Sequence, residues 1–198
     1  MKNGELILGS TSPRRKEIME FFSYPFQQVA PPFDESLIPF TGNPQEYVTK
    51  LAQGKAHSLA PIFSNSIIVT CDTIVFIDNE VLGKPKDEQE AFRMLAKLSG
   101  RWHSVFTAIA VSRQNRLLSA VTETKVHCNT LSQEDIHRYY RAHSLNDKAG
   151  SYAIQRSGGL LVKEIVGCYY NVMGLPVGAL RTLLQQVGID LWDHLKPF

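Results

Sequence analysis

The chain has 198 residues, 43% of them hydrophobic, and this length suits one large domain that buries a sizeable core without disulfide staples. A net charge of +2 is too balanced to indicate a surface for duplex nucleic acid, and three dispersed cysteines without a CxxC pair argue against a disulfide framework or structural zinc. No apolar run approaches a membrane span. We therefore expect a single domain over residues 1–198, located in the cytoplasm, with no nucleic-acid and no membrane partner.

The first predicted elements are a strand at Leu6–Leu8 and a helix from Pro13 to Phe22. Ser12 is placed as the helix N-cap, with Pro13 at the first helical position. The first turn then carries Arg14 and Arg15, although the helix dipole favours acidic residues there. A phosphate bound at this helix start would remove the conflict, because backbone N–H groups, hydroxyls and guanidinium groups all bind phosphate. A solvated basic turn is the alternative.

A second helix is predicted from Pro44 to Leu59, with Asn43 as its N-cap and Lys55 late in the helix. Before it, the acidic pair Asp34-Glu35 follows a strand-like segment. Exposed acidic pairs in loops usually serve solubility alone, so Glu35 becomes a candidate ligand only if a second carboxylate joins it.

An acidic residue interrupts the next strand pattern. The run Ile67–Ile77 is largely β-branched, which indicates a strand covered on both faces, and Asp72 lies in its middle. An ionised carboxylate is costly to bury unless it is paired or bound to a metal, so Asp72 is a candidate catalytic residue. A structural Asp at a strand end is the alternative. With Glu35, Asp72 offers the oxygen ligands that Mg²⁺ or Mn²⁺ accepts.

The rest of the chain mixes strands and helices, so the predicted sheet is mixed. Lys84 lies in an extended Gly83-Lys84-Pro85 segment and is a candidate phosphate contact, as are Lys55 and Lys148. The other predicted elements are a return strand ending at Leu82, a helix capped by Asp87 and Glu90, paired strands at Trp102–Ser112 and Leu117–Cys128, a helix from Ser132 to Tyr140, a hairpin across Val166-Gly167 and a helix from Pro176 to Gln186.

A loop rich in glycine and serine runs from Ala142 to Gly159. Its segment Asp147–Gln155 combines small residues, an aromatic ring and an amide, which suits a pocket that reads a base; an ordinary turn is the competing interpretation. The six histidines show no metal-ligand spacing, so no zinc site is indicated.

Taken together, these motifs resemble the Maf family of nucleoside triphosphate pyrophosphatases over nearly the whole chain. The resemblance rests on Ser10-Thr11-Ser12-Pro13-Arg14-Arg15, Asp34-Glu35, Lys55-Ala56, Cys71-Asp72-Thr73, Gly83-Lys84-Pro85, Leu98-Ser99-Gly100, Asp147-Lys148-Ala149-Gly150 with Gln155, and Gly174-Leu175-Pro176. It implies an α/β fold like that of inosine triphosphate pyrophosphatase: a mixed, elongated, twisted sheet with helices on both sides and two lobes around a cleft.

The resemblance also implies an activity and its residues. A nucleoside triphosphate would be cleaved to the monophosphate and pyrophosphate by a homodimer, with Asp72 catalytic and a divalent cation, Mg or Mn, held by Glu35 and Asp72. The implied substrate-binding residues are Ser10, Ser12, Arg14, Arg15, Lys55, Thr73, Lys84, Lys148 and Gln155.

Two branches of the family differ at three of these positions. Arg14, Thr73 and Gln155 are similar to the branch that acts on dTTP and UTP, whereas the 7-methyl-GTP branch typically carries Trp, Gln and Glu. A 7-methyl-GTP pyrophosphatase and a non-catalytic nucleotide-binding regulator of cell division are the alternatives. One departure is Gln53-Gly54 before Lys55, where the family commonly has an acidic residue.

Overall fold

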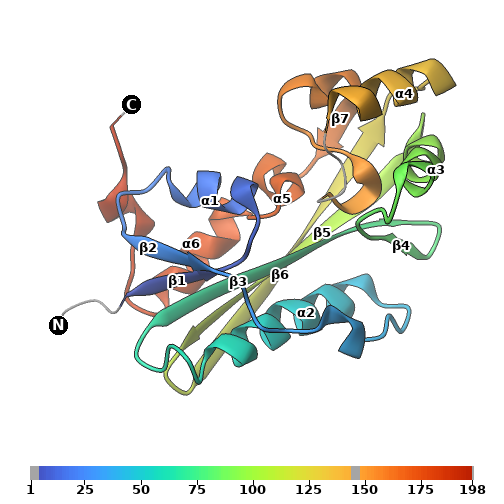
Figure 1. Cartoon of the computed structure of the whole chain (residues 1–198). Coiled ribbons are helices and arrows are strands. Elements are labelled where there is room, and N and C mark those ends of the chain that lie inside the picture. The colour runs from blue at the N-terminus through green and yellow to red at the C-terminus, as the bar shows by residue number, and fades with distance from the viewer. Residues whose placement is uncertain (1–4, 144–147, 198) are drawn as a thin grey trace. The chain divides into compact units, whose positions relative to one another are not determined.

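The computed structural model describes residues 5–143 and 148–197 (Figure 1). The chain forms two compact units. Unit 1 comprises Met1–Asp72, Thr107–Thr122 and Gly174–Phe198, and unit 2 comprises Thr73–Phe106 and Glu123–Met173. Because the chain passes between them several times, neither unit is a continuous segment. The single domain expected over residues 1–198 stays a prediction.

A seven-stranded mixed sheet organises the chain, in the order β2-β1-β3-β5-β6-β7 with β4 paired to β3. Strand β1 is parallel to β2 and β3, whereas β4 is antiparallel to β3 and β7 is antiparallel to β6. The α/β class and the mixed sheet predicted from the sequence are thus confirmed. The strands are β1 Leu6–Gly9, β2 Phe26–Val29, β3 Ile67–Ile77, β4 Glu80–Leu82, β5 Trp102–Arg113, β6 Arg116–Cys128 and β7 Val162–Val166.

The helices follow the predicted order with two corrections. Helix α1 ends at Met19, earlier than the expected Phe22. The hairpin predicted across Val166-Gly167 is wrong, because a short helix follows β7. The helices are α1 Pro13–Met19, α2 Pro44–Leu59, α3 Glu88–Leu98, α4 Gln133–Ala142, α5 Tyr169–Met173 and α6 Val177–Gln185, with 3₁₀ turns η1 Glu35–Leu37, η2 Ala149–Ser151, η3 Arg156–Leu160 and η4 Leu191–His194.

Long-range hydrogen bonds explain the wrong hairpin. Gly167 has a positive φ of 135°, and the next residue, Cys168, donates its N–H to Thr124 Oγ1 at 3.0 Å. Asn171, which is fully buried, donates its side-chain amide to Val105 O and to Thr124 Oγ1, each at 2.9 Å. These bonds hold the chain in a helical turn where a returning strand was expected.

In unit 1, helix α2 packs on one face of β1 and β3, with α1 and α6 on the other side (Figure 1). Leu59 of α2 forms a buried cluster with Ile7 and Ile68. The approach is close at Gly9, where an added Cβ would lie 2.5 Å from a methyl group of Leu59, so a larger residue would force the neighbouring side chains to shift. This packing fixes the height of α2 along β3, and therefore the position of the side chains near its C-terminal end.

In unit 2, helices α3 and α4 pack together over a core that includes Leu95, Leu98, Val126 and Ile136. Among the described residues, no helix is both long and apolar enough to cross a membrane.

Candidate active site

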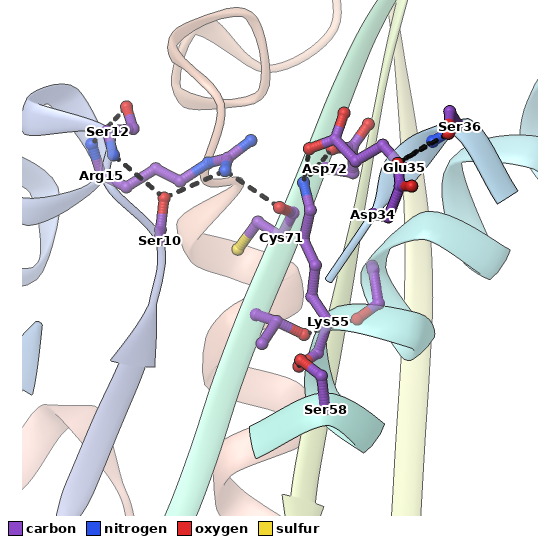
Figure 2. Close-up of polar contacts among 12 residues, drawn as sticks. Ser10, Ser12, Arg15, Asp34, Glu35, Ser36, Lys55, Ser58, Cys71 and Asp72 are labelled. Atoms are coloured by element: carbon purple, nitrogen blue, oxygen red, sulfur yellow. Dashed lines mark hydrogen bonds and ion pairs between the residues drawn. The ribbon is translucent and has the colours of Figure 1, made fainter. Parts of the chain in front are cut away.

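Two carboxylates converge on one lysine in unit 1 (Figure 2). Lys55 Nζ lies 2.5 Å from Asp72 Oδ1 and 2.8 Å from Glu35 Oε1. The side chains of Lys55 and Asp72 are only 11% and 10% exposed, whereas Glu35 is 49% exposed. Asp72 is therefore a buried carboxylate paired with a cation, and Glu35 closes the cluster toward solvent.

Local geometry explains why Lys55 meets Asp72. Thr70, which is fully buried, donates its hydroxyl to the Ala52 carbonyl at 2.7 Å and so ties β3 to α2. Asp72 lies two residues after Thr70 on the same face of the strand, and Lys55 lies three residues after Ala52 on the same side of the helix. One hydrogen bond thus aligns the strand face and the helix face that carry the ion pair.

Burial is the largest influence on the pKa of Asp72. Desolvation raises the pKa of its carboxyl, while the positive charges of Lys55 and Arg15 partly oppose the rise. The carboxylate consequently takes up a proton more readily than an exposed Asp would, which is the property required of a general base. Asp34, at the surface beside Glu35, behaves in the opposite way: its bonds from Ser36 lower the pKa and cap η1.

The loop that carries Glu35 is anchored by a contact that sequence reasoning missed. A Cβ added to Gly54 would lie 2.3 Å from Cζ of Phe33, so the aromatic ring occupies the space beside the glycine. This contact accounts for Gly54, one residue before Lys55. At Gln53, the side-chain amide donates to Ser119 Oγ at 3.0 Å. Both residues that depart from the family pattern thus have a defined contact in the structure.

We expect Gly54→Ala to displace Phe33, and with it Glu35. Gly→Ala inside a helix normally stabilises by about 0.5–1 kcal/mol, but over-packing costs about 1–3 kcal/mol, so this variant should lose stability. Misplacing Glu35 should lower kcat/KM about tenfold or more.

Gly178→Ala in α6 is the matched control, because a Cβ there would meet no heavy atom of the described residues within 4 Å. Thermal melts and steady-state kinetics of both variants make the comparison. Equal behaviour of the two alanine variants would show that the ring contact does not position the loop.

The start of helix α1 is an ordered loop with a cationic residue fixed into it. Ser12 Oγ accepts from Arg15 N at 3.5 Å, and Ser10 Oγ accepts from Ser12 N at 3.2 Å. The Arg15 guanidinium donates to Gly174 O at 2.8 Å, Cys71 O at 2.9 Å and Ser10 Oγ at 3.1 Å. Arg15 therefore braces the residue before Asp72, as Figure 2 shows. Arg14 is half-buried on the same turn; phosphate contacts by both residues stay predictions.

The donor set suits a hard divalent cation. Glu35 and Asp72 already share one positive charge, the Lys55 ammonium, through oxygens that Mg²⁺ or Mn²⁺ would accept. Within the described ranges, no group of three or more His, Cys, Asp or Glu side chains is placed to hold a metal. Two carboxylates without a closed cage fit an ion that keeps water and substrate phosphates in its shell.

The other predicted substrate-binding residues belong to unit 2. Lys84 is exposed, and the preceding Gly83 accepts from Gly150 N at 3.0 Å, which joins its segment to the one carrying Lys148 and Gln155. Gln155 is half-buried, and its Oε1 atom is buried without a hydrogen-bond partner among the described residues. The structure also describes Thr73 and Lys148. Asp147, which precedes Lys148 in its sequence motif, lies outside the described residues.

Tyr47 is a further neighbour of the carboxylates that the sequence did not single out. Burial and the negative charges of Asp72 and Glu35 raise the pKa of its phenol. Tyr47 lies eight residues before Lys55 on α2, and two helical turns place both on one side of the helix. That spacing is the signal that could have identified it.

Comparison with known proteins defines the class and then the family. The solved structure of the Staphylococcus aureus Ham1 protein covers 92% of this chain and 99% of its own, with a TM-score of 0.53 and 12% identity, which shows a shared fold. Residues 5–187 match the family described as Maf-like protein, so the chain belongs to the Maf family.

Two relatives named dTTP/UTP pyrophosphatase match nearly end to end. The protein of Chlamydia felis is 43% identical over 192 residues, covering 96% of this chain and 98% of the relative. The protein of Clostridium botulinum (strain Kyoto / Type A2) is 41% identical over 196 residues, covering 96% and 100%.

Proposed function

We propose that this protein is a nucleoside triphosphate pyrophosphatase that hydrolyses dTTP and UTP to the monophosphate and pyrophosphate. The observation that carries the proposal is the buried Asp72, paired with Lys55 beside Glu35, in a chain 41–43% identical to dTTP/UTP pyrophosphatases. A carboxylate with a raised pKa inside an apolar strand is suited to proton transfer and contributes little to folding.

In this reaction Asp72 orients a water molecule and accepts its proton. The water oxygen forms a bond to the α-phosphorus, the bond to the bridging oxygen breaks, and pyrophosphate leaves. Arg14, Arg15, Lys55 and Lys84 neutralise charge on the triphosphate and on the leaving group. Glu35 and Asp72 would hold the divalent cation, Mg²⁺ or Mn²⁺, and a bound cation neutralises phosphate charge in such reactions.

The base preference follows from the hydrogen-bond donors and acceptors that Gln155 offers. Uracil and thymine present acceptor, donor and acceptor along their pairing edge, so the amide can accept from N3–H through Oε1 and donate to a neighbouring carbonyl. The Gln155 Oε1 atom, buried without a hydrogen-bond partner among the described residues, supports this role. Arg14 and Thr73, which resemble the same branch, and Lys148 complete the proposed substrate contacts, with Ser10 and Ser12 at the phosphate end.

Pyrophosphate release from dTTP, UTP, CTP, GTP and 7-methyl-GTP tests the proposal. We expect dTTP and UTP to exceed GTP by about 10- to 100-fold in kcat/KM, or roughly 1.4–2.8 kcal/mol. Gln155→Glu should narrow that ratio, mainly by harming the pyrimidines, because a carboxylate repels their carbonyls.

The alternatives give different results in the same assay. A wild-type preference for 7-methyl-GTP would assign the protein to the other branch. Nucleotide binding without hydrolysis, with Mg²⁺ or Mn²⁺ present, would favour the regulator of cell division. We further propose a cytoplasmic homodimer, as the family resemblance implies.

A further inference from the structure

The segment Lys148–Gln155 of unit 2, here called the base loop, is held by a buried pair of polar rings. We propose that the hydrogen bond between His103 and Tyr152 positions the base loop, so that this pair sets the selectivity exerted by Gln155. The inference rests on the proposed function, because it assigns a residue pair to the base-reading half of the reaction.

The pair is buried and closely aligned. His103, on β5, is 4% exposed and Tyr152 is 6% exposed. His103 Nε2 lies 2.7 Å from the Tyr152 hydroxyl, and the ring centroids are 5.5 Å apart at an interplanar angle of 84°. The hydrogen bond and the edge-to-face contact together fix both the distance and the tilt of the Tyr152 ring.

Stability alone does not explain two polar rings at this position. His103 Nδ1 is buried without a hydrogen-bond partner among the described residues, and an unsatisfied buried polar atom costs free energy. Burial lowers the pKa of His103 to about 4 and raises that of Tyr152, so both rings are neutral near pH 7. An apolar pair would avoid the unpaired nitrogen. Departures of this kind from good core design concentrate at functional sites.

The residues on each side of Tyr152 have anchors of their own, including Ser151 Oγ, which donates to Met94 Sδ at 3.2 Å, so the His103 bond acts on the Tyr152 ring itself. Before Tyr152, Gly150 donates its N–H to Gly83 O at 3.0 Å. Its φ is 67°, and a Cβ added there would lie 2.9 Å from a methyl group of Val75. After Tyr152, the N–H of Ala153 donates to the Tyr139 hydroxyl at 3.1 Å.

Only two residues lie between Tyr152 and the base-reading amide of Gln155, and the chain bends at Ile154 and Gln155. Tyr152 has φ −141° and ψ 164°, and Gln155, three residues later, has φ −74° and ψ 159°. Because so short a stretch of chain joins them, we infer that a shift of the Tyr152 ring is transmitted to Gln155. The His103–Tyr152 bond therefore acts on selectivity through position, and neither ring needs to touch the base.

Tyr152→Phe removes the bond and keeps the ring. We expect KM for dTTP and UTP to rise and the kcat/KM ratio of dTTP over GTP to fall about three- to tenfold, the factor produced by one lost hydrogen bond. Inhibition by inorganic pyrophosphate, which has no base, should keep the wild-type inhibition constant. Tyr140→Phe, which removes a hydroxyl elsewhere in the same core, is the matched control and should leave the ratio unchanged.

The double variant His103→Phe with Tyr152→Phe separates positioning from packing. Two apolar rings remove the unsatisfied polar atoms, so the melting temperature should return to or exceed that of wild type while the dTTP:GTP ratio stays low. A double variant that is stable and as selective as wild type would overturn the inference. The inference would also be overturned if wild type releases pyrophosphate selectively from dTTP and Tyr152→Phe keeps the wild-type dTTP:GTP ratio of kcat/KM. A wild type that hydrolyses none of the triphosphates would instead refute the proposed function.

Discussion

Replacing Asp72 with asparagine is expected to lower kcat by about two orders of magnitude or more, the scale of a lost general base. The side chain keeps its shape and loses the charge that burial opposes. The melting temperature should therefore hold or rise. Steady-state pyrophosphate release and thermal melts on the same preparations give the two readouts.

Asp72 should make the free energy of unfolding depend on pH. Its folded pKa is raised above the ordinary value of 3.8, so the native state holds the proton more tightly than the unfolded state does. Between these two pKa values the free energy of unfolding falls as the pH rises. Asp72→Asn removes this loss. The stability of the variant relative to wild type should therefore increase between the two pKa values and stay higher above them.

Asp78→Asn is the matched control. Asp78 pairs with Arg101 at 2.6 Å on the surface, and its positive φ of 53° suits asparagine as well as aspartate. This variant should keep its activity. An Asp72→Asn protein that turns over at nearly the wild-type rate would remove Asp72 from the chemistry, and one that unfolds would assign it a structural role.

Replacing Lys55 with methionine should have the second large effect. The change leaves Asp72 and Glu35 without the ammonium that both contact. Removing one partner of a buried ion pair typically costs about 3–5 kcal/mol, although proton uptake by Asp72 limits the loss at low pH. We expect kcat/KM to fall by about two orders of magnitude or more, because a phosphate contact and the alignment of Asp72 are lost together.

Two comparisons test the Lys55 prediction. Lys50→Met removes a lysine of the same helix whose partner, Glu46 at 2.6 Å, is half exposed, so its effect on stability should stay within about 0.5 kcal/mol. Lys55→Met combined with Asp72→Asn should recover stability without recovering activity. If Lys55→Met matches Lys50→Met in both melts and kinetics, the ion pair has no role in catalysis or in stability.

Features controlled by neighbouring residues were predictable from the sequence. The start of α2 is one example, because Asn43 Oδ1 accepts from Gln45 N and Glu46 N, as its N-cap position requires. The capping pair at α3 was only half right. Asp87 accepts from Glu90 N at 2.7 Å as predicted, but Glu90 Oε2 accepts from Lys86 N, one residue before the cap.

Features that depend on distant residues were beyond sequence reasoning. Phe33 and Gly54 are far apart in sequence, and neither residue type indicates that a ring fills the space beside the glycine. The bonds from Arg15 to Cys71 and Gly174 likewise need the folded chain. Asp72 could be identified earlier because its signal is local: a charge inside an apolar strand.

Pyrophosphate release by wild type and Asp72→Asn, assayed side by side with dTTP and Mg²⁺ or Mn²⁺, tests the central claim most directly. We expect wild type to produce one thymidine monophosphate and one pyrophosphate per dTTP, and Asp72→Asn, folded and at least as stable, to be slower by about two orders of magnitude or more. Release of inorganic phosphate in place of pyrophosphate, or equal rates for the two proteins, would contradict it.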